Sequence, residues 1–380
     1  MMIDWARTDM GELPEYSMPD GDCPVKLDAN EAAEDFPPPL KEEVLRRLAA
    51  MEFNRYPERA AAGLTATLSR FLGVPGECII LGSGSDELIQ MLALAVGPGR
   101  RAVIPAPTFS MYRHSVRLTG SVPVEVPLNE DFSLDAEKVL AAAGAEPGLI
   151  FLGSPNNPTG NCIPTAVLET VLRNTASLVV VDEAYGEFAA QEFLPLLDRY
   201  DNLLLLRTFS KAFGLAGIRV GYGVASVRVC RRLRRVKPPY NLNIFAALAA
   251  TVALEKPEYC RERIVRVRWE RDRMAAALRA LPGVEVYPSE ANFLLFRIPG
   301  KGKAIAGQLR AAGIAVRSFD GESRLADCLR VTVGGREENG LLGDRLRRLL
   351  AAGEQGEEGD GDAGRPECPE NEGDRRRSCG

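Results

Sequence analysis

The sequence is poor in the residues that several common kinds of site require. Its 380 residues include one histidine, His114, and eight cysteines, with no CxxC pair among them. A histidine triad or a histidine-ligated metal would depend on a single side chain, so no metal site is predicted. No apolar run approaches the ~20 residues that cross a bilayer, and the acidic N-terminus lacks the apolar core of a signal peptide. We therefore expect reduced thiols, no membrane partner and a cytoplasmic location.

Net charge is small and belongs to one end of the chain. It amounts to −5, which argues against a nucleic-acid partner. Residues 353–380 hold nine acidic and four basic residues, so this segment alone carries that charge. Because the segment has almost no apolar side chains, burial cannot offset the entropy lost on ordering it. We predict a disordered acidic tail at 353–380.

Hydrophobic runs of strand length alternate with helical stretches through most of the chain. The runs lie at 78–81, 101–104, 122–126, 149–152, 178–181, 203–206 and 220–224. Near-continuous apolar strands between helices indicate a parallel sheet that is covered on both faces. The sequence thus predicts an α/β fold with a mostly parallel, seven-stranded sheet. Ligands of such sheets bind at the carboxyl ends of the strands.

The length predicts more than one domain, because single cores stop growing at about 250–300 residues. Residues 1–40, rich in proline and acidic residues, are expected to form an N-terminal arm. A large domain is expected over 41–275 and a small α+β domain over 276–352. The expected helices outside the alternating region lie at 39–51, 60–72, 243–281 with a break at Pro257, 302–312 and 336–351.

Three loops that follow predicted strands contain candidate ligand-binding residues. Gly82-Ser83-Gly84-Ser85-Asp86-Glu87 opens a helix whose free N–H groups suit a phosphate, although a simple capped turn explains the loop equally well. Ser154–Gly160 (SPNNPTG) has turn chemistry and offers Asn157 as a donor. Asp182 follows a predicted buried strand directly, and a buried carboxylate needs a cationic partner. The alternative interpretation is that Asp182 binds a metal ion.

A fourth loop contains a lysine where an exposed charge is not expected. The chain has only eight lysines against 39 arginines, and Lys211 lies in the apolar, glycine-rich run TFSKAFGLAGIRVGY. A desolvated lysine with a lowered pKa can act as a nucleophile toward an aldehyde. A phosphate cradle, an amide donor, a carboxylate and such a lysine together match the needs of pyridoxal 5′-phosphate.

In this order and spacing, SPNNPTG, VVVDEAY and the SK…G.R.GY signature resemble the fold-type I aminotransferases that use pyridoxal phosphate. Within that family the sequence is similar to the histidinol-phosphate aminotransferases, over roughly residues 14–351. The segments that narrow the resemblance are VKLDANE (25–31), NRYP (54–57), GSGSDE (82–87), PPYNLN (238–243), ANFL (291–294) and LRVTVG (329–334). One departure is that Glu31 is followed by AAEDFP, where relatives usually have Asn-Pro-Tyr-Gly.

The resemblance implies roles for individual residues. Lys211 would attach the cofactor and move a substrate proton, Asp182 would pair with the ring nitrogen, and Tyr185 would bond the ring oxygen. Further cofactor contacts would come from Ser85, Asp86, Phe109, Asn157, Ser210, Arg219 and, in a homodimer with shared sites, Tyr56 of the other subunit. The substrate would be bound by Tyr16, Asn30, Arg317 and Arg330.

The implied reaction is transamination between L-histidinol phosphate, a phosphorylated amino alcohol, and 2-oxoglutarate, giving imidazole acetol phosphate and glutamate in histidine biosynthesis. An aromatic amino-acid aminotransferase or a threonine-phosphate decarboxylase of the same branch is the nearest alternative. A non-catalytic ligand-sensing module on the same fold is the distant one.

The position of the acidic tail leads to a prediction. Deletion of residues 353–380 should leave turnover essentially unchanged, because the expected site residues all lie before 331. Steady-state rates of the full-length and truncated proteins test this expectation. A large loss of turnover on truncation would show that the tail contributes to the active enzyme.

Overall fold

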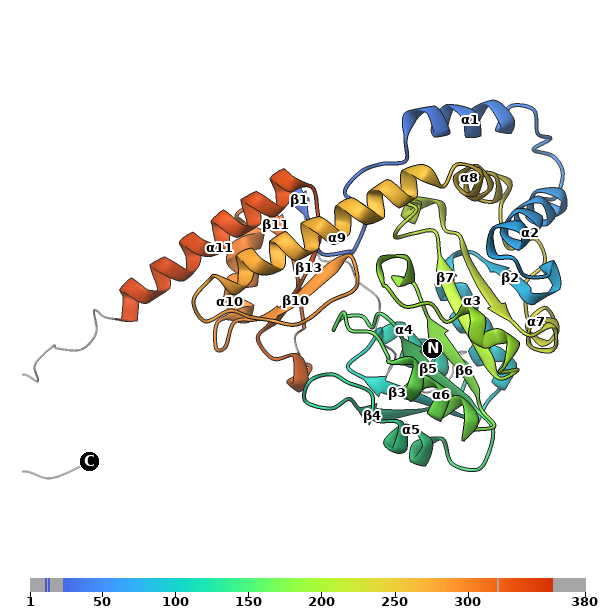
Figure 1. The fold of residues 1–380 in the computed structure, drawn as a ribbon, viewed down its shortest axis with the longest axis horizontal. Helices are drawn as coiled ribbons and strands as arrows, with labels where there is room; N and C mark the ends of the chain where they lie inside the picture. The colour runs from blue at the N-terminus through green and yellow to red at the C-terminus, as the bar shows by residue number, and fades with distance from the viewer. Residues whose placement is uncertain (1–10, 12, 14–22, 320, 358–380) are drawn as a thin grey trace, which may run out of the picture.

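A seven-stranded sheet lies at the centre of the computed structural model, which describes residues 11, 13, 23–319 and 321–357 (Figure 1). Its strands run in the order β2-β8-β7-β6-β5-β3-β4. Their bounds are Ile79–Gly82 (β2), Arg101–Ala106 (β3), Val122–Pro127 (β4), Leu149–Gly153 (β5), Leu178–Asp182 (β6), Leu203–Thr208 (β7) and Gly221–Ala225 (β8). Only β8 runs against its neighbours among these strands. The predicted α/β fold with a mostly parallel sheet is confirmed.

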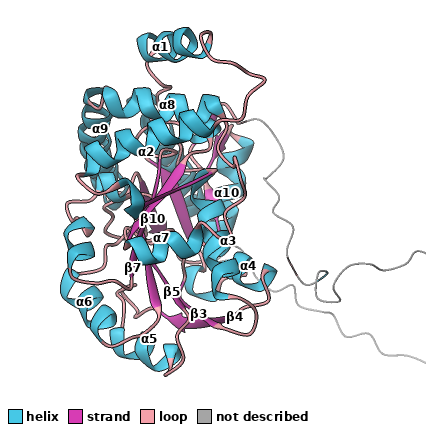
Figure 2. Cartoon of the chain, turned by 90° about the vertical axis from the view of Figure 1, so that its right-hand side faces the viewer, coloured by secondary structure: helices cyan, strands magenta, loops and turns pink. Residues whose placement is uncertain are grey.

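Helices cover both faces of the sheet because its strands are apolar on both sides (Figure 2). On β6, Val180 packs into a core with α3, α4 and α7, whereas Val179 and Val181 pack on the other side with α5 and α6. Successive side chains of a strand point to opposite faces, so Asp182 shares the face of Val180. The helices are α3 (Gly84–Val96), α4 (Ser110–Leu118), α5 (Ala136–Ala143), α6 (Thr165–Arg173) and α7 (Val227–Leu233).

A second, smaller sheet lies to one side of the large one (Figure 1). It is antiparallel, in the order β12-β13-β10-β9, and three helices pack against it. The elements are α9 (Glu258–Arg279), β9 (Glu285–Val286), β10 (Phe293–Arg297), α10 (Gly302–Ala311), β11 (Ile314–Ala315), β12 (Arg317–Ser318), β13 (Cys328–Thr332) and α11 (Arg336–Glu357). The expected α+β character of this region is confirmed.

Two segments connect the large and the small sheet. Helix α9 contributes Cys260 to a core beside the large sheet and Met274 to the core of the small one. Near the N-terminus, β1 (Val25–Lys26) pairs in parallel with β11, which brings residues 28–30 toward the space between the sheets. The proposed domain boundary at 275/276 therefore falls within a continuous helix, and it stays a prediction.

The remaining helices are α1 (Pro38–Leu48), α2 (Glu58–Leu72) and α8 (Ile244–Glu255), so the predicted break at Pro257 is present. In the described part of the chain, no helix has the length and apolar character needed to cross a membrane. Helix α11 continues to Glu357, beyond the predicted start of the acidic tail. Residues 358–380 lie outside the described residues, and their disorder stays a prediction.

Candidate active site

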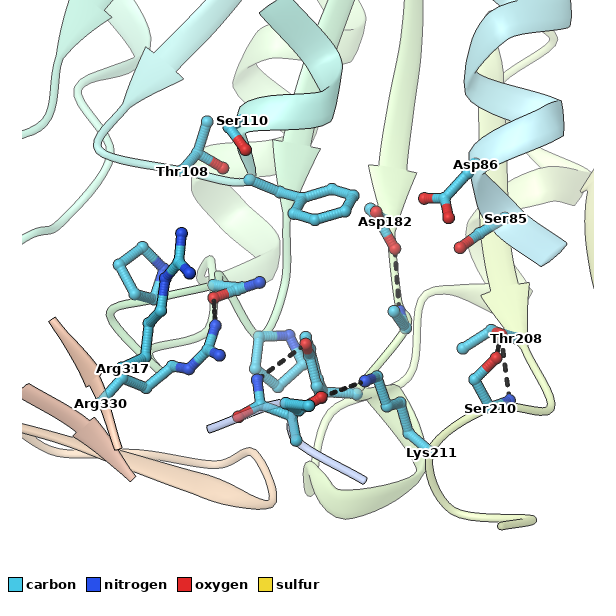
Figure 3. Close-up of a pocket in the computed structure, with 18 of the residues that line it drawn as sticks. Ser85, Asp86, Thr108, Ser110, Asp182, Thr208, Ser210, Lys211, Arg317 and Arg330 are labelled. Atoms are coloured by element: carbon cyan, nitrogen blue, oxygen red, sulfur yellow. Dashed lines mark hydrogen bonds between the residues drawn. The ribbon is translucent and has the colours of Figure 1, made fainter. Parts of the chain in front are cut away.

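A cavity of about 340 Å³ lies where the parallel strands of the large sheet end, next to β12 and β13 of the small one (Figure 3). Residues from both regions therefore contribute to one site. Among the sequence-predicted site residues, those that line the cavity are Asn30, Ser85, Asp86, Phe109, Asn157, Asp182, Tyr185, Ser210, Lys211, Arg219, Arg317 and Arg330. The structure thus brings together residues that are up to 300 positions apart in sequence.

Tyr56 is the described candidate that does not line the cavity. Its side chain is 74% exposed, and its ring stacks on that of Tyr240 with centroids 4.2 Å apart. It therefore lies on the surface of the chain, outside the cavity. Tyr16, the other predicted substrate contact from the N-terminal arm, lies outside the described residues.

The phosphate cradle predicted at Gly82–Glu87 has the geometry of an anion site. Ser85 and Asp86 occupy the first turn of α3, where backbone N–H groups have no partner within the helix. Arg219 donates to Ser210 Oγ at 3.3 Å and to Asp86 Oδ2 at 3.1 Å, so both side chains lie at this helix end. Gly84 has a φ of +77°, and a Cβ there would lie 2.5 Å from Arg219 Nη2. The positive φ therefore favours glycine at this position.

Asp182 is a buried carboxylate with an unfavourable charge environment. Its Oδ2 accepts a hydrogen bond from the Tyr112 hydroxyl at 2.6 Å, and its Oδ1 accepts one from the Ala184 amide at 2.9 Å. Burial, with smaller contributions from the nearby Asp86 and Glu183, raises its pKa to about 6 even though these two hydrogen bonds act in the opposite direction. Glu183, the adjacent carboxylate, instead pairs with Arg207 at 2.8 Å. Of the two acids in the motif, Asp182 is the one that needs a cationic ligand.

Lys211 lies in the loop that follows β7 and lines the same cavity as Asp182 (Figure 3). Its Nζ donates to the Ala29 carbonyl at 3.0 Å and lies 5.8 Å from the centroid of the Tyr185 ring. Burial, with a smaller contribution from the charge of Arg330, lowers its pKa to about 8. A substantial neutral fraction near pH 8 makes this amine a competent nucleophile and base.

Tyr185 and Asn30 join the two parts of the site. The Asn30 amide donates to the Tyr185 hydroxyl at 3.0 Å, and the Asn30 backbone N–H donates to Thr332 Oγ1 at 2.9 Å. Asn30 has a φ of +53°, and its carbonyl accepts from Asn292 Nδ2 at 3.1 Å. Asn30 thus connects Tyr185, which follows β6 of the large sheet, to Thr332 at the end of β13 in the small sheet. Burial raises the pKa of Tyr185.

Two arginines form the small-sheet side of the cavity. Arg317 on β12 and Arg330 on β13 are paired directly across the antiparallel ladder, so their side chains share one face. Arg330 is buried and donates to Asn157 Oδ1 at 2.6 Å and to the Asp28 carbonyl, whereas Arg317 is exposed. Two adjacent like charges at a cavity wall favour a ligand with anionic groups.

Some cavity residues were missed at the sequence level, namely Asp28, Thr108, Ser110, Tyr112, Thr208, Phe319 and Glu322. Thr208 ends β7, so its position at a strand end could have indicated it, whereas Tyr112 lies inside α4, where a tyrosine is expected to be a core residue. Phe319 and Glu322 come from an irregular segment after β12 that has no sequence motif.

Comparison with known proteins identifies the family of the chain. The sequence profile of the family described as "Aminotransferase class I and II" matches residues 24–342, which is most of the chain. The chain belongs to the class I and II aminotransferase family. Its sequence is 42% identical over 340 residues to histidinol-phosphate aminotransferase 2 of Nitrosococcus oceani, covering 88% of this chain and 94% of that protein.

Two further comparisons support the aminotransferase assignment. Histidinol-phosphate aminotransferase of Thermococcus kodakarensis is 41% identical, covering 88% of this chain and 96% of that protein. A crystal structure of the Sinorhizobium meliloti histidinol-phosphate aminotransferase in complex with pyridoxal 5′-phosphate superimposes with a TM-score of 0.79. That structure is 27% identical, and the match covers 87% of this chain and 91% of that one. The expected fold-type I architecture and aminotransferase activity are thus confirmed.

The residues of this aminotransferase fit pyridoxal phosphate on their own chemistry. A buried carboxylate beside like charges suits a pyridinium N–H group, and an amine with a pKa of about 8 suits an aldehyde. The first turn of α3 with Ser210 and Arg219 suits a phosphate dianion. These three groups line a single cavity, as one ligand requires.

The buried carboxylate leads to a pH prediction for the cofactor-free protein. The pKa of Asp182 is raised from 3.8 to about 6, so the folded state binds this proton more tightly than the unfolded chain. Its contribution to stability therefore falls as the pH rises through this window. Between about pH 5 and pH 8, the wild type should lose about 1 kcal/mol more unfolding free energy than Asp182→Asn.

Urea unfolding of both proteins at both pH values measures this difference. The exposed Asp344 provides the control, since Asp344→Asn should keep the pH dependence of the wild type. Equal pH dependence in the wild type and Asp182→Asn would show that Asp182 is ionised at no cost in the folded protein.

Proposed function

We propose that this aminotransferase catalyses transamination between L-histidinol phosphate and 2-oxoglutarate, with pyridoxal 5′-phosphate as its cofactor, in histidine biosynthesis. The observation that carries the proposal is the in-register pair Arg317 and Arg330 on the cavity wall that faces Lys211. A phosphate monoester and a dicarboxylate are the anions that a pair of guanidinium groups can bind in turn. The relatives at 41–42% identity are named histidinol-phosphate aminotransferases, which supports the proposed amino donor.

The position of each residue in the cavity indicates its role toward the cofactor. Bound pyridoxal phosphate supplies an electron-withdrawing ring that stabilises negative charge at the substrate Cα. Asp182 would pair with the ring nitrogen and keep it protonated, and Tyr185 with Asn157 would bond the ring oxygen. Phe109 would pack on the ring face. Lys211 would take up the proton from the substrate Cα and deliver it to C4′ of the cofactor, since an amine with a pKa of about 8 can both accept and donate a proton near neutral pH.

The phosphate of the cofactor would be held by the N–H groups of Ser85 and Asp86 together with Ser210 and Arg219. At the other end of the cavity, buried Arg330 would bind the carboxylate of glutamate. Exposed Arg317, with Asn30 and Tyr16, would contribute to binding histidinol phosphate.

We also propose a homodimer in which Tyr56 completes the partner's site. Tyr56 does not line the cavity of its own chain. Together with Phe53 and Tyr240, which are 71% and 43% exposed, it places aromatic rings on the surface. Exposed aromatic groups of this kind are characteristic of protein interfaces.

The cytoplasmic location expected from the sequence stays a prediction.

Comparison of substrates tests the function. The purified protein should convert L-histidinol phosphate with 2-oxoglutarate at a kcat on the order of 10 per second. Its kcat/KM should exceed those for phenylalanine and O-phospho-L-threonine. The Lys211→Ala variant should show no turnover and serves as the control for contaminating activity. A higher kcat/KM with phenylalanine, or release of CO₂ from O-phosphothreonine, would favour one of the alternatives from the same branch.

The two arginines should contribute unequally to the two half-reactions. Arg330→Ala should lower kcat/KM for glutamate by roughly a hundredfold, because it removes a buried charge that binds the carboxylate. Arg317→Ala should cost about tenfold and act mainly on histidinol phosphate, because an exposed charge is screened by solvent. Arg347→Ala, on the exposed face of α11, is the matched control. Equal losses with glutamate for both cavity variants would refute this division.

A further inference from the structure

One buried side chain of the cavity has no role in the proposed mechanism. Tyr112 lies in α4, is 2% exposed, and directs its hydroxyl at Asp182 Oδ2 from 2.6 Å. Its ring stacks on Phe151 with centroids 4.9 Å apart and an interplanar angle of 6°. Phe109 meets the same ring edge-on at 5.6 Å. These contacts fix the ring, so the hydroxyl has a fixed direction.

The position of Tyr112 follows from the alternation of β6. Asp182 shares a face with Val180, and Val180 packs in the same apolar core as Tyr112. The hydroxyl therefore reaches Asp182 from the face of the sheet that α4 covers, whereas the cavity lies beyond the carboxyl end of β6. The Ala184 amide holds the other carboxylate oxygen at 2.9 Å. With one donor on each oxygen, the plane of the carboxylate is fixed before a ligand binds.

The charges around Asp182 give this hydrogen bond its importance. Asp86 from α3 and Glu183 from the end of β6 are both negative and act against ionisation of Asp182. The hydrogen bond from Tyr112 acts in the opposite direction and lowers the pKa of Asp182. Burial and the same carboxylate raise the pKa of Tyr112 well above its usual value, so its hydroxyl keeps its proton and remains a donor.

We propose that Tyr112 is a positioning residue that orients the Asp182 carboxylate and favours its charged form, and so prepares it for the ring nitrogen of the cofactor. This proposal rests on the proposed function only in its choice of cofactor. The hydroxyl touches the carboxylate and acts through it, without contact to the reacting atoms.

The test is Tyr112→Phe, which keeps the ring in its stack and removes the hydroxyl alone. Titration of the cofactor-free protein with pyridoxal 5′-phosphate should give a dissociation constant about tenfold higher than that of the wild type at pH 7. The loss should become smaller as the pH rises to 8.5, because Asp182 then ionises without help from the hydroxyl. Turnover should show a lower kcat with little change in KM.

Tyr222→Phe is the matched control. It removes the hydroxyl of another buried tyrosine, on β8, which lies outside the cavity and interacts with Arg207. Its cofactor dissociation constant should stay within about twofold of the wild type. Equal affinities for Tyr112→Phe and the wild type at pH 7 would overturn the proposal. So would an equally large loss in Tyr222→Phe.

A double-mutant cycle tests whether Tyr112 acts through Asp182. In an Asp182→Asn background, Tyr112→Phe should change the dissociation constant by less than about threefold, because the charge that the hydroxyl favours is gone. An undiminished tenfold effect would overturn the proposed route. Cofactor titration needs no amino-acid substrate. A wild type that binds the cofactor but leaves histidinol phosphate unchanged would therefore refute the proposed function and leave this proposal intact.

Discussion

The site depends on one electrostatic constraint, the burial of the Asp182 carboxylate at the end of a central strand. Burial raises its pKa to about 6, and Asp86 and Glu183 add to the unfavourable field. Two donors, the Tyr112 hydroxyl and the Ala184 amide, partly offset this cost in the folded chain. A ligand with a cationic N–H group can supply the remainder. The folded chain therefore holds Asp182 in an orientation and environment that favour such a ligand before the ligand binds.

The cavity contains groups from both sheets, and the two sheets contribute different chemistry. The large sheet places an acid, an amine and a helix N-terminus at one edge, and these groups suit a cofactor. Further positive charge comes from Arg317 and Arg330 on the small sheet, and it would suit the anionic substrates proposed above. Asn30 joins the two parts through its contacts to Tyr185 and Thr332. The N-terminal segment therefore has a structural role at the site, whatever follows Glu31 in the sequence.

Much of this arrangement could be predicted because the signals are local. Apolar runs between helices indicated all seven strands of the large sheet, and the loops after them contained most of the cavity residues. Tyr112 was missed because a tyrosine in an amphipathic helix is usually a core residue, and its packing on Phe151 is indeed that of one. The role proposed for Tyr112 depends on the direction of its hydroxyl toward Asp182, and residue types in the sequence do not specify that direction.

The sequence by itself determined the fold class, the order of the strands along the chain and the chemistry at their ends, since hydrophobic periodicity and short motifs act over neighbouring residues. Only the tertiary structure decided which groups meet. It paired Glu183 with Arg207 and left Asp182 to face the cavity, and it set Arg317 opposite Arg330. Both outcomes depend on the register and on the alternation of faces between strands. A shift by one residue would turn these side chains away from the site.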